Sequence, residues 1–226
     1  MTKDEVIELL EENKEPRGIA YWERVGFPGK TYGIGLTMLK QLGKKVGKDH
    51  ELALELWESG IYDLQILATI IDDPKKVTQN QVRKQVKHVS FWMLSHAYCS
   101  TLLAKLPFMK ELAEEWIESE NHIERRCGYA LLYHIAKDNK DLPDSYFENY
   151  ISVIVSTIQS EENFVKDAMN NAMLMIGQRS KNLNDQCIRG VQKYGKLDID
   201  YGDNSCQPAD VIGNLTSDRI QNKILK

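Results

Sequence analysis

The stretch "HVSFWMLSHAYC", from His88 to Cys99, carries chemically active side chains within an otherwise apolar run. Trp92 and His96 are four residues apart, which places both on one face of a helix. An indole ring can pack on a sugar or a base, and a neutral imidazole can accept a proton from water. This face is therefore a candidate floor of a site. The alternatives are that Trp92 is a core residue and that His96 is a hydrogen-bonded structural histidine.

Helices are the elements that must position these residues, because apolar residues recur at helical spacing along most of the chain and almost no strand is indicated. A first helix is expected over Glu5–Glu12, where Thr2 and Glu5 form the pattern of a capping box, and a second over Gly35–Val46. The expected pairs that follow, and one last helix, are His50–Glu58 with Ile61–Ile71, Thr78–Lys87 with Phe91–Lys105, Phe108–Ser119 with His122–Lys137, Asp144–Ile158 with Glu162–Gln178, and Asn184–Lys193.

The second helices of these pairs begin at regular intervals of a few dozen residues, at Ile61, Phe91, Ile123 and Phe164. A helix pair cannot bury its apolar face alone, so stacked pairs are expected to form an all-α, α-α superhelix of the HEAT or armadillo type, with the second helices lining a concave inner face. An irregular helical domain is the alternative. Trp57 and Trp116, at amphipathic spacing on first helices, are expected in the core.

A single domain is expected over residues 1–226, with N-terminal helices in 1–46, stacked pairs in 47–195, and a polar loop and C-terminal segment in 196–226. The acidic spacing of the loop, residues 196–209, fails the calcium-loop pattern because its glycine is misplaced and no closing glutamate follows. The four cysteines lie far apart without a CxxC pair, which indicates neither a zinc site nor a disulfide framework. No metal and no cofactor are expected.

The net charge of −4 argues mildly against a partner bound by bulk electrostatics alone. No apolar run approaches the roughly 20 residues that a membrane span needs, and the opening residues are acidic and amphipathic, unlike a signal peptide. A cytoplasmic protein without a membrane partner is therefore expected, and a monomer is favoured.

Several separated motifs, in order, resemble the HEAT-like repeat DNA alkylation-repair glycosylases. The resemblance covers roughly residues 32–210 and is carried by "GKDHELALELWESGIYDLQILATIIDDPKKVT", "HVSFWMLSHAYCSTLL", "HIERRCGYALL", "NFVKDAMNNAMLMIGQR" and the late "DYGDNSCQPAD". It implies a helix-lined groove that embraces duplex DNA and excises cationic alkylated purines such as 3-methyladenine and 7-methylguanine. It also implies a site built from two tryptophans that pack on the deoxyribose, an aspartate beside the developing sugar cation, and an arginine on the DNA backbone.

Transferred to this chain, the first tryptophan of the family falls on Trp92 and the arginine on Arg126, with Arg125 beside it. The aspartate falls on His96 and the second tryptophan on Asn171, so two of the chemical groups are replaced. Aspartate supplies a fixed negative charge beside an oxocarbenium-like sugar, whereas neutral histidine does not. The resemblance therefore predicts an altered catalytic set.

Three functions follow as hypotheses: a DNA-binding repair protein with weak, altered or lost base excision, an active glycosylase in which His96 acts as general base, and a protein-interaction scaffold that has abandoned DNA. The expected partner is duplex DNA, alkylated or otherwise distorted. Arg125 and Arg126 are alternatively salt-bridge partners of Glu118 and Glu120. The residues expected to contact DNA are Arg83, Lys84, Arg125, Arg126, Lys166 and Arg179.

Overall fold

The computed structural model describes residues 1–224, and their contacts group into two compact units. The first unit consists of Met1–Met109 and Tyr201–Asn204, and the second of Lys110–Asp200 and the residues from Ser205 onward. The last two residues of the expected C-terminal segment lie outside the described part. Whether the chain is a single domain stays a prediction.

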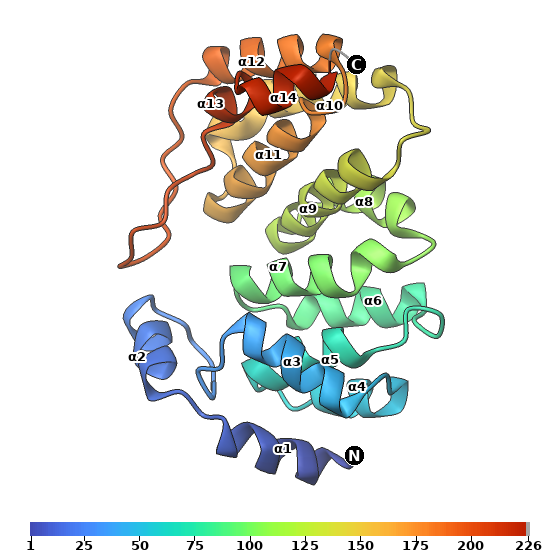
Figure 1. Cartoon of the computed structure of the whole chain (residues 1–226), viewed down its shortest axis with the longest axis vertical. Coiled ribbons are helices and arrows are strands. Elements are labelled where there is room, and N and C mark those ends of the chain that lie inside the picture. The colour runs from blue at the N-terminus through green and yellow to red at the C-terminus, as the bar shows by residue number, and fades with distance from the viewer. Residues whose placement is uncertain (225–226) are drawn as a thin grey trace. The chain divides into compact units, whose positions relative to one another are not determined.

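The first unit is built from short α-helices (Figure 1). The helix α5 packs against α3, α4 and α7. The elements are α1 (Lys3–Glu12), α2 (Pro16–Arg24), α3 (Leu36–Val46), α4 (His50–Trp57), α5 (Tyr62–Ile71), α6 (Gln79–Gln85), η1 (Val86–His88), α7 (Trp92–Thr101) and η2 (Leu103–Lys105).

The second unit is also helical, and its main packing is between α9 and α11 and between α10 and α12 (Figure 1). Its elements are α8 (Met109–Ile117), whose first residue belongs to the first unit, α9 (His122–Asp138), α10 (Asp144–Thr157), η3 (Ile158–Ser160), α11 (Asn163–Ile176), α12 (Lys181–Tyr194), α13 (Val211–Leu215) and α14 (Asp218–Ile224).

Most of the expected helices are present, with ends shifted by a few residues. The capping box of α1 forms, with the Thr2 side chain accepting from the Glu5 amide and the Glu5 carboxylate accepting from the Thr2 amide. Trp57 and Trp116 are both 1% exposed, which confirms their core assignment. Within residues 1–224 strand pairing is limited to one isolated parallel bridge between Lys30 and Ile61, and none of the helices described there could span a membrane.

Three helices were not expected from the sequence: α2, α13 and α14. Pro16 occupies the first helical position of α2, where proline is well tolerated, and the Glu15 side chain accepts from the Arg17 amide. A Cβ atom on Gly18 would lie 1.9 Å from the Gly33 carbonyl oxygen, so α2 packs directly against backbone. This close approach requires glycine at position 18, although glycine lowers the helix propensity of the α2 sequence.

The buried carboxylate of Asp63 holds the connection between α2 and α3 against α5. It accepts from the Thr31 hydroxyl at 2.7 Å and from the amides of Tyr32 at 2.7 Å and Ile34 at 2.9 Å. Burial raises the pKa of Asp63, while these hydrogen bonds act in the opposite direction. The extended segment that carries the aromatic residues after α2 is thereby fixed to the first unit.

Replacing Asp63 with alanine should destabilise the first unit by about 3 kcal/mol, because two buried backbone amides would lose their acceptor. Chemical denaturation followed by far-ultraviolet circular dichroism measures this loss. Asp198→Ala, at an exposed loop position, is the matched control and should leave the unfolding midpoint unchanged. Equal midpoints for the two variants would contradict the anchoring role.

Candidate nucleic-acid interface

The helix α7 is held in place by buried polar contacts on the side away from Trp92. The Thr101 hydroxyl lies 2.6 Å from that of Thr69 on α5, and the Tyr98 hydroxyl donates to the Gln85 side chain at 3.0 Å. The Ser95 hydroxyl donates to the Trp92 carbonyl oxygen at 2.6 Å, within the first turn of α7. These contacts fix the rotation of α7 and so the direction of its first turn.

Trp92 is half-buried at the edge of an aromatic cluster in the first unit. Its ring lies 5.9 Å from Phe91, which is 5.7 Å from Trp22 and 5.2 Å from Phe27. On its other side it meets Tyr201 at 6.2 Å. Trp92 is therefore neither sealed in the core nor isolated on the surface.

His96, one turn beyond Trp92, is exposed. An exposed imidazole can meet DNA or solvent, but it supplies no fixed negative charge. The sequence indicated Trp92 and His96 but not the neighbours of Trp92. The aromatic residues Tyr21, Trp22 and Phe27 are the signal from which these neighbours could be predicted, had a helix been expected there.

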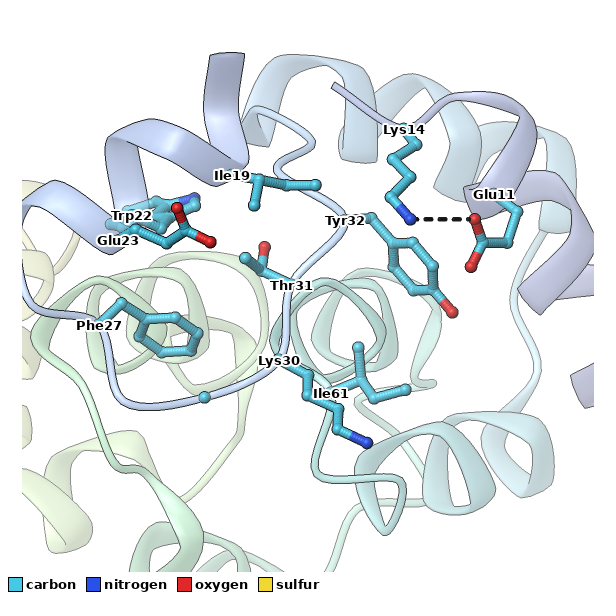
Figure 2. Close-up of a pocket in the computed structure, with 11 residues that line it drawn as sticks. Glu11, Lys14, Ile19, Trp22, Glu23, Phe27, Lys30, Thr31, Tyr32 and Ile61 are labelled. Carbon is cyan, nitrogen blue, oxygen red and sulfur yellow. Dashed lines mark hydrogen bonds and ion pairs between the residues drawn. The ribbon is translucent and has the colours of Figure 1, made fainter. Parts of the chain in front are cut away.

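A cavity of about 460 Å³ lies beside the same aromatic cluster (Figure 2). Trp22 and Phe27 belong to both, and Tyr32 lines the opposite end. Its charged lining consists of two lysines and two glutamates, Lys14, Lys30, Glu11 and Glu23. The charges balance, so this cavity does not favour a polyanion and is not the expected phosphate-binding surface.

The two cations of α6 differ in their surroundings. Lys84 is exposed, and Arg83 is half-buried and donates to the Gln79 side chain at 2.9 Å. Both lie in the last turn of α6. They remain candidates for phosphate contacts from the first unit.

Arg125 of the second unit is committed to intramolecular contacts. Its Nε and Nη2 atoms form a two-pronged pair with Glu161, with a shortest distance of 2.9 Å, and Nη1 donates to the carbonyl oxygens of Ser119 and Glu120. The alternative that Arg125 forms a salt bridge with Glu118 or Glu120 is therefore wrong, because its salt-bridge partner is Glu161. Arg126 is only 3% exposed. In this conformation neither guanidinium is an open phosphate ligand, contrary to the expectation from the sequence.

Arg179 also has a structural role where a DNA contact was expected. Its Nη1 atom donates to the carbonyl oxygens of Ala136 at 2.8 Å and Asn139 at 2.7 Å, and Nη2 donates to that of Leu142 at 2.8 Å. The guanidinium lies 4.3 Å from the ring centre of Phe147. These contacts satisfy the carbonyls at the end of α9 and in the following connection.

The remaining predicted site residues of the second unit lie on α11. Asn171 is half-buried and donates to the carbonyl oxygen and carboxylate of Asp167, one turn earlier. Its amide is thus engaged on its own helix. Lys166 is half-buried. The convergence of Trp92, His96, Arg126 and Asn171 on one surface stays a prediction, since the first two belong to one unit and the last two to the other.

Most of the chain matches a known protein family. A sequence profile described as DNA alkylation repair enzyme matches residues 6–193, most of the chain. The chain belongs to the DNA alkylation repair enzyme family.

This DNA alkylation repair family member is similar to two uncharacterized proteins of Listeria. One, from Listeria innocua, is 27% identical over 224 residues, covering 97% of this chain and 98% of the relative. The other, from Listeria monocytogenes, is 24% identical over 228 residues, covering 99% and 100%.

A solved structure also resembles this DNA alkylation repair family member, with a TM-score of 0.87, 20% sequence identity, and coverage of 99% of this chain and 96% of that chain. That protein is described as one of a new family related to the HEAT-like repeat DNA glycosylases with affinity for branched DNA structures. At this level of identity the likeness establishes the fold. The HEAT-like repeat, all-helical fold expected from the sequence is confirmed.

Replacing Arg179 with alanine should lower the free energy of unfolding by about 2 to 4 kcal/mol, because three carbonyl groups lose a charged donor and Phe147 loses its cation. Thermal and denaturant unfolding measure the effect. Arg189→Ala, which removes an exposed arginine from α12, is the control and should be nearly neutral. A variant that keeps its stability but loses DNA binding would restore Arg179 as a DNA contact.

Proposed function

We propose that this chain binds DNA that is distorted or branched and that its base excision by the family's electrostatic mechanism is lost or strongly reduced. The observation that carries the proposal is the exposed His96 one turn beyond a half-buried Trp92. An aromatic group that can pack on a nucleotide is kept, while the fixed negative charge needed beside a sugar cation is absent at this position. Membership of the DNA alkylation repair enzyme family supports DNA as the ligand.

The preference for branched DNA is proposed from the similar solved structure, whose protein is described as having affinity for such DNA. Flaps and junctions with single-stranded gaps expose backbone and unpaired bases together, which suits a surface that combines cations with aromatic rings. The candidate cations are Lys84 and Arg83 on α6 and Lys166 on α11. Arg125 and Arg179 are not candidates, because their N–H groups donate hydrogen bonds within the protein.

DNA binding should be salt-sensitive, with log affinity falling against log salt by about 0.9 for each duplex phosphate neutralised. Changing Arg83 and Lys84 together to alanine should therefore weaken binding and flatten this slope. Fluorescence anisotropy with labelled branched and linear duplexes at several salt concentrations measures both quantities.

The control is the change of Lys193 and Lys196 to alanine, which removes the same charge from exposed positions at and just beyond the end of α12. An equal loss in both double variants would show only a general charge effect. If the parent protein binds neither DNA at low salt, the chain is an interaction scaffold on the same fold and the proposal fails.

Excision of 7-methylguanine from methylated duplex should be absent or very slow in the parent protein. His96→Asp should restore part of the rate, and His96→Asp with Asn171→Trp should restore more than the two single changes combined, because groups that act on one transition state are not additive. One preorganised charged group is worth roughly 10²-fold or more in rate.

Release of the base from methylated DNA is followed by chromatography for the parent, the two single variants and the double variant. His96→Ala tests the alternative that histidine is itself a general base. If the parent excises the base and His96→Ala abolishes this activity, the chain is an active glycosylase that uses His96. A double variant that binds DNA and stays inert would show that other parts of the catalytic arrangement are lost.

A further inference from the structure

The tip of the loop after α12, Tyr201–Asn204, belongs to the first unit and contacts both α7 and α2. The Tyr201 ring meets Trp92 at a centroid distance of 6.2 Å and an interplanar angle of 76°, an edge-to-face contact. Two residues later, the Asp203 carboxylate lies 3.6 Å from the Nε atom of Arg24, the last residue of α2. One short segment thus places an aromatic ring on Trp92 and an anion on Arg24.

The backbone of the tip is shaped for these two contacts. Gly202, between the aromatic and the acidic residue, has a φ of 81°, a conformation that favours glycine. A Cβ atom at this position would lie 3.1 Å from the Cβ atom of Val25, so the tip passes close to the end of α2. The Asn204 side chain donates to the Tyr201 carbonyl oxygen at 2.6 Å, which closes the turn. The contact of Tyr201 with Trp92 is therefore a property of the turn as a whole.

The ion pair of the tip is nevertheless weak enough to be replaced. The side chains of Arg24 and Asp203 are 56% and 78% exposed, and an ion pair so open to solvent contributes little to stability. The Arg24 guanidinium also lies 5.7 Å from the ring centre of Tyr21, which keeps it at the surface beside the aromatic cluster. A phosphate carries more charge than a carboxylate and offers an arginine paired acceptors.

We propose that Trp92 and Arg24 form a binding site for one unpaired nucleotide, and that the tip Tyr201–Asn204 occupies this site when no DNA is bound. The Trp92 ring stacks on the base, and the Arg24 guanidinium binds the adjoining phosphate. Tyr201 and Asp203 provide the same two chemistries, a ring and an anion, and so act as an internal competitor. This inference rests on the proposed function and names the part of a branched DNA that the first unit recognises.

An unpaired nucleotide fits better than a paired one because the faces of a paired base are covered by its neighbours in the duplex. Stacking on an aromatic side chain needs an exposed base face, as single-stranded segments provide. The phosphate beside an unpaired base is also free to follow the protein surface. The site therefore selects the single-stranded part of a junction or flap over a blunt duplex.

The test measures binding of a short labelled oligothymidylate and of a blunt duplex by fluorescence anisotropy. Tyr201→Ala and Asp203→Asn should each tighten oligothymidylate binding by about three- to tenfold, because the competitor is weakened while the gain is limited to one stacked base or one phosphate contact. Arg24→Ala should weaken it by a similar factor and lower the salt slope by about 0.7, the value for one single-strand phosphate. Duplex binding should not change.

Matched controls separate these effects from a change of net charge. Asp198→Asn removes the same charge from an exposed position nearer the base of the loop, and Arg17→Ala removes an exposed arginine from the first turn of α2. Both should bind oligothymidylate like the parent. Circular dichroism verifies that every variant is folded.

The inference is overturned if Tyr201→Ala and Asp203→Asn bind oligothymidylate no more tightly than Asp198→Asn, or if Arg24→Ala matches Arg17→Ala. Weaker binding by the loop variants would also overturn it, since the tip would then be part of the DNA-binding surface. If the parent binds branched DNA by its duplex arms and no variant responds to single strands, the inference fails and the proposed function stands. If neither the parent nor the loop variants bind any DNA, both fail.

Discussion

Backbone groups in the connections between helices must be hydrogen-bonded once they are buried, and buried polar side chains do this in both units. Asp63 accepts from the segment between α2 and α3. Asn170 and Asn184 donate to carbonyl oxygens of the C-terminal part, at Ala209 and Leu215. Each contact joins a connecting segment or the end of a short helix to another helix, so the positions of the helices depend on these buried atoms.

The candidate DNA surface of the first unit follows from this arrangement. The Asp63 contacts fix the segment after α2, and this segment carries Phe27, which packs against Phe91. Trp22 of α2 packs on the same Phe91 ring. Phe91 in turn supports Trp92 at the edge of the cluster. The half-exposed indole is thus held by a rigid aromatic layer, which reduces the conformational entropy that it would lose on binding a nucleotide.

The sequence predicted the helices that have long apolar stripes and missed three short ones, α2, α13 and α14. The pattern around α2 is short and contains Gly18, whose use is visible only when Gly33 lies against it. The roles of the cationic side chains were harder to predict than the helices. Composition cannot distinguish an arginine that binds phosphate from one such as Arg125 or Arg179. The Glu161 carboxylate that pairs with Arg125 is 36 residues away in the chain, and the Ala136 carbonyl that accepts from Arg179 is 43 residues away. The family motif located Trp92 and His96 but could not report the contact with Tyr201.

Stacked helical repeats are usually modular, since each repeat contacts only its neighbours and can be removed or duplicated at modest cost. Arg179 limits this modularity in the second unit. It follows α11 in the chain, yet it satisfies the carbonyl groups at the end of α9 and in the connection to α10. A deletion that removed α11 and its following turn would leave an earlier repeat without its cap. In this chain the segment from α9 to the turn after α11 therefore acts as one structural block.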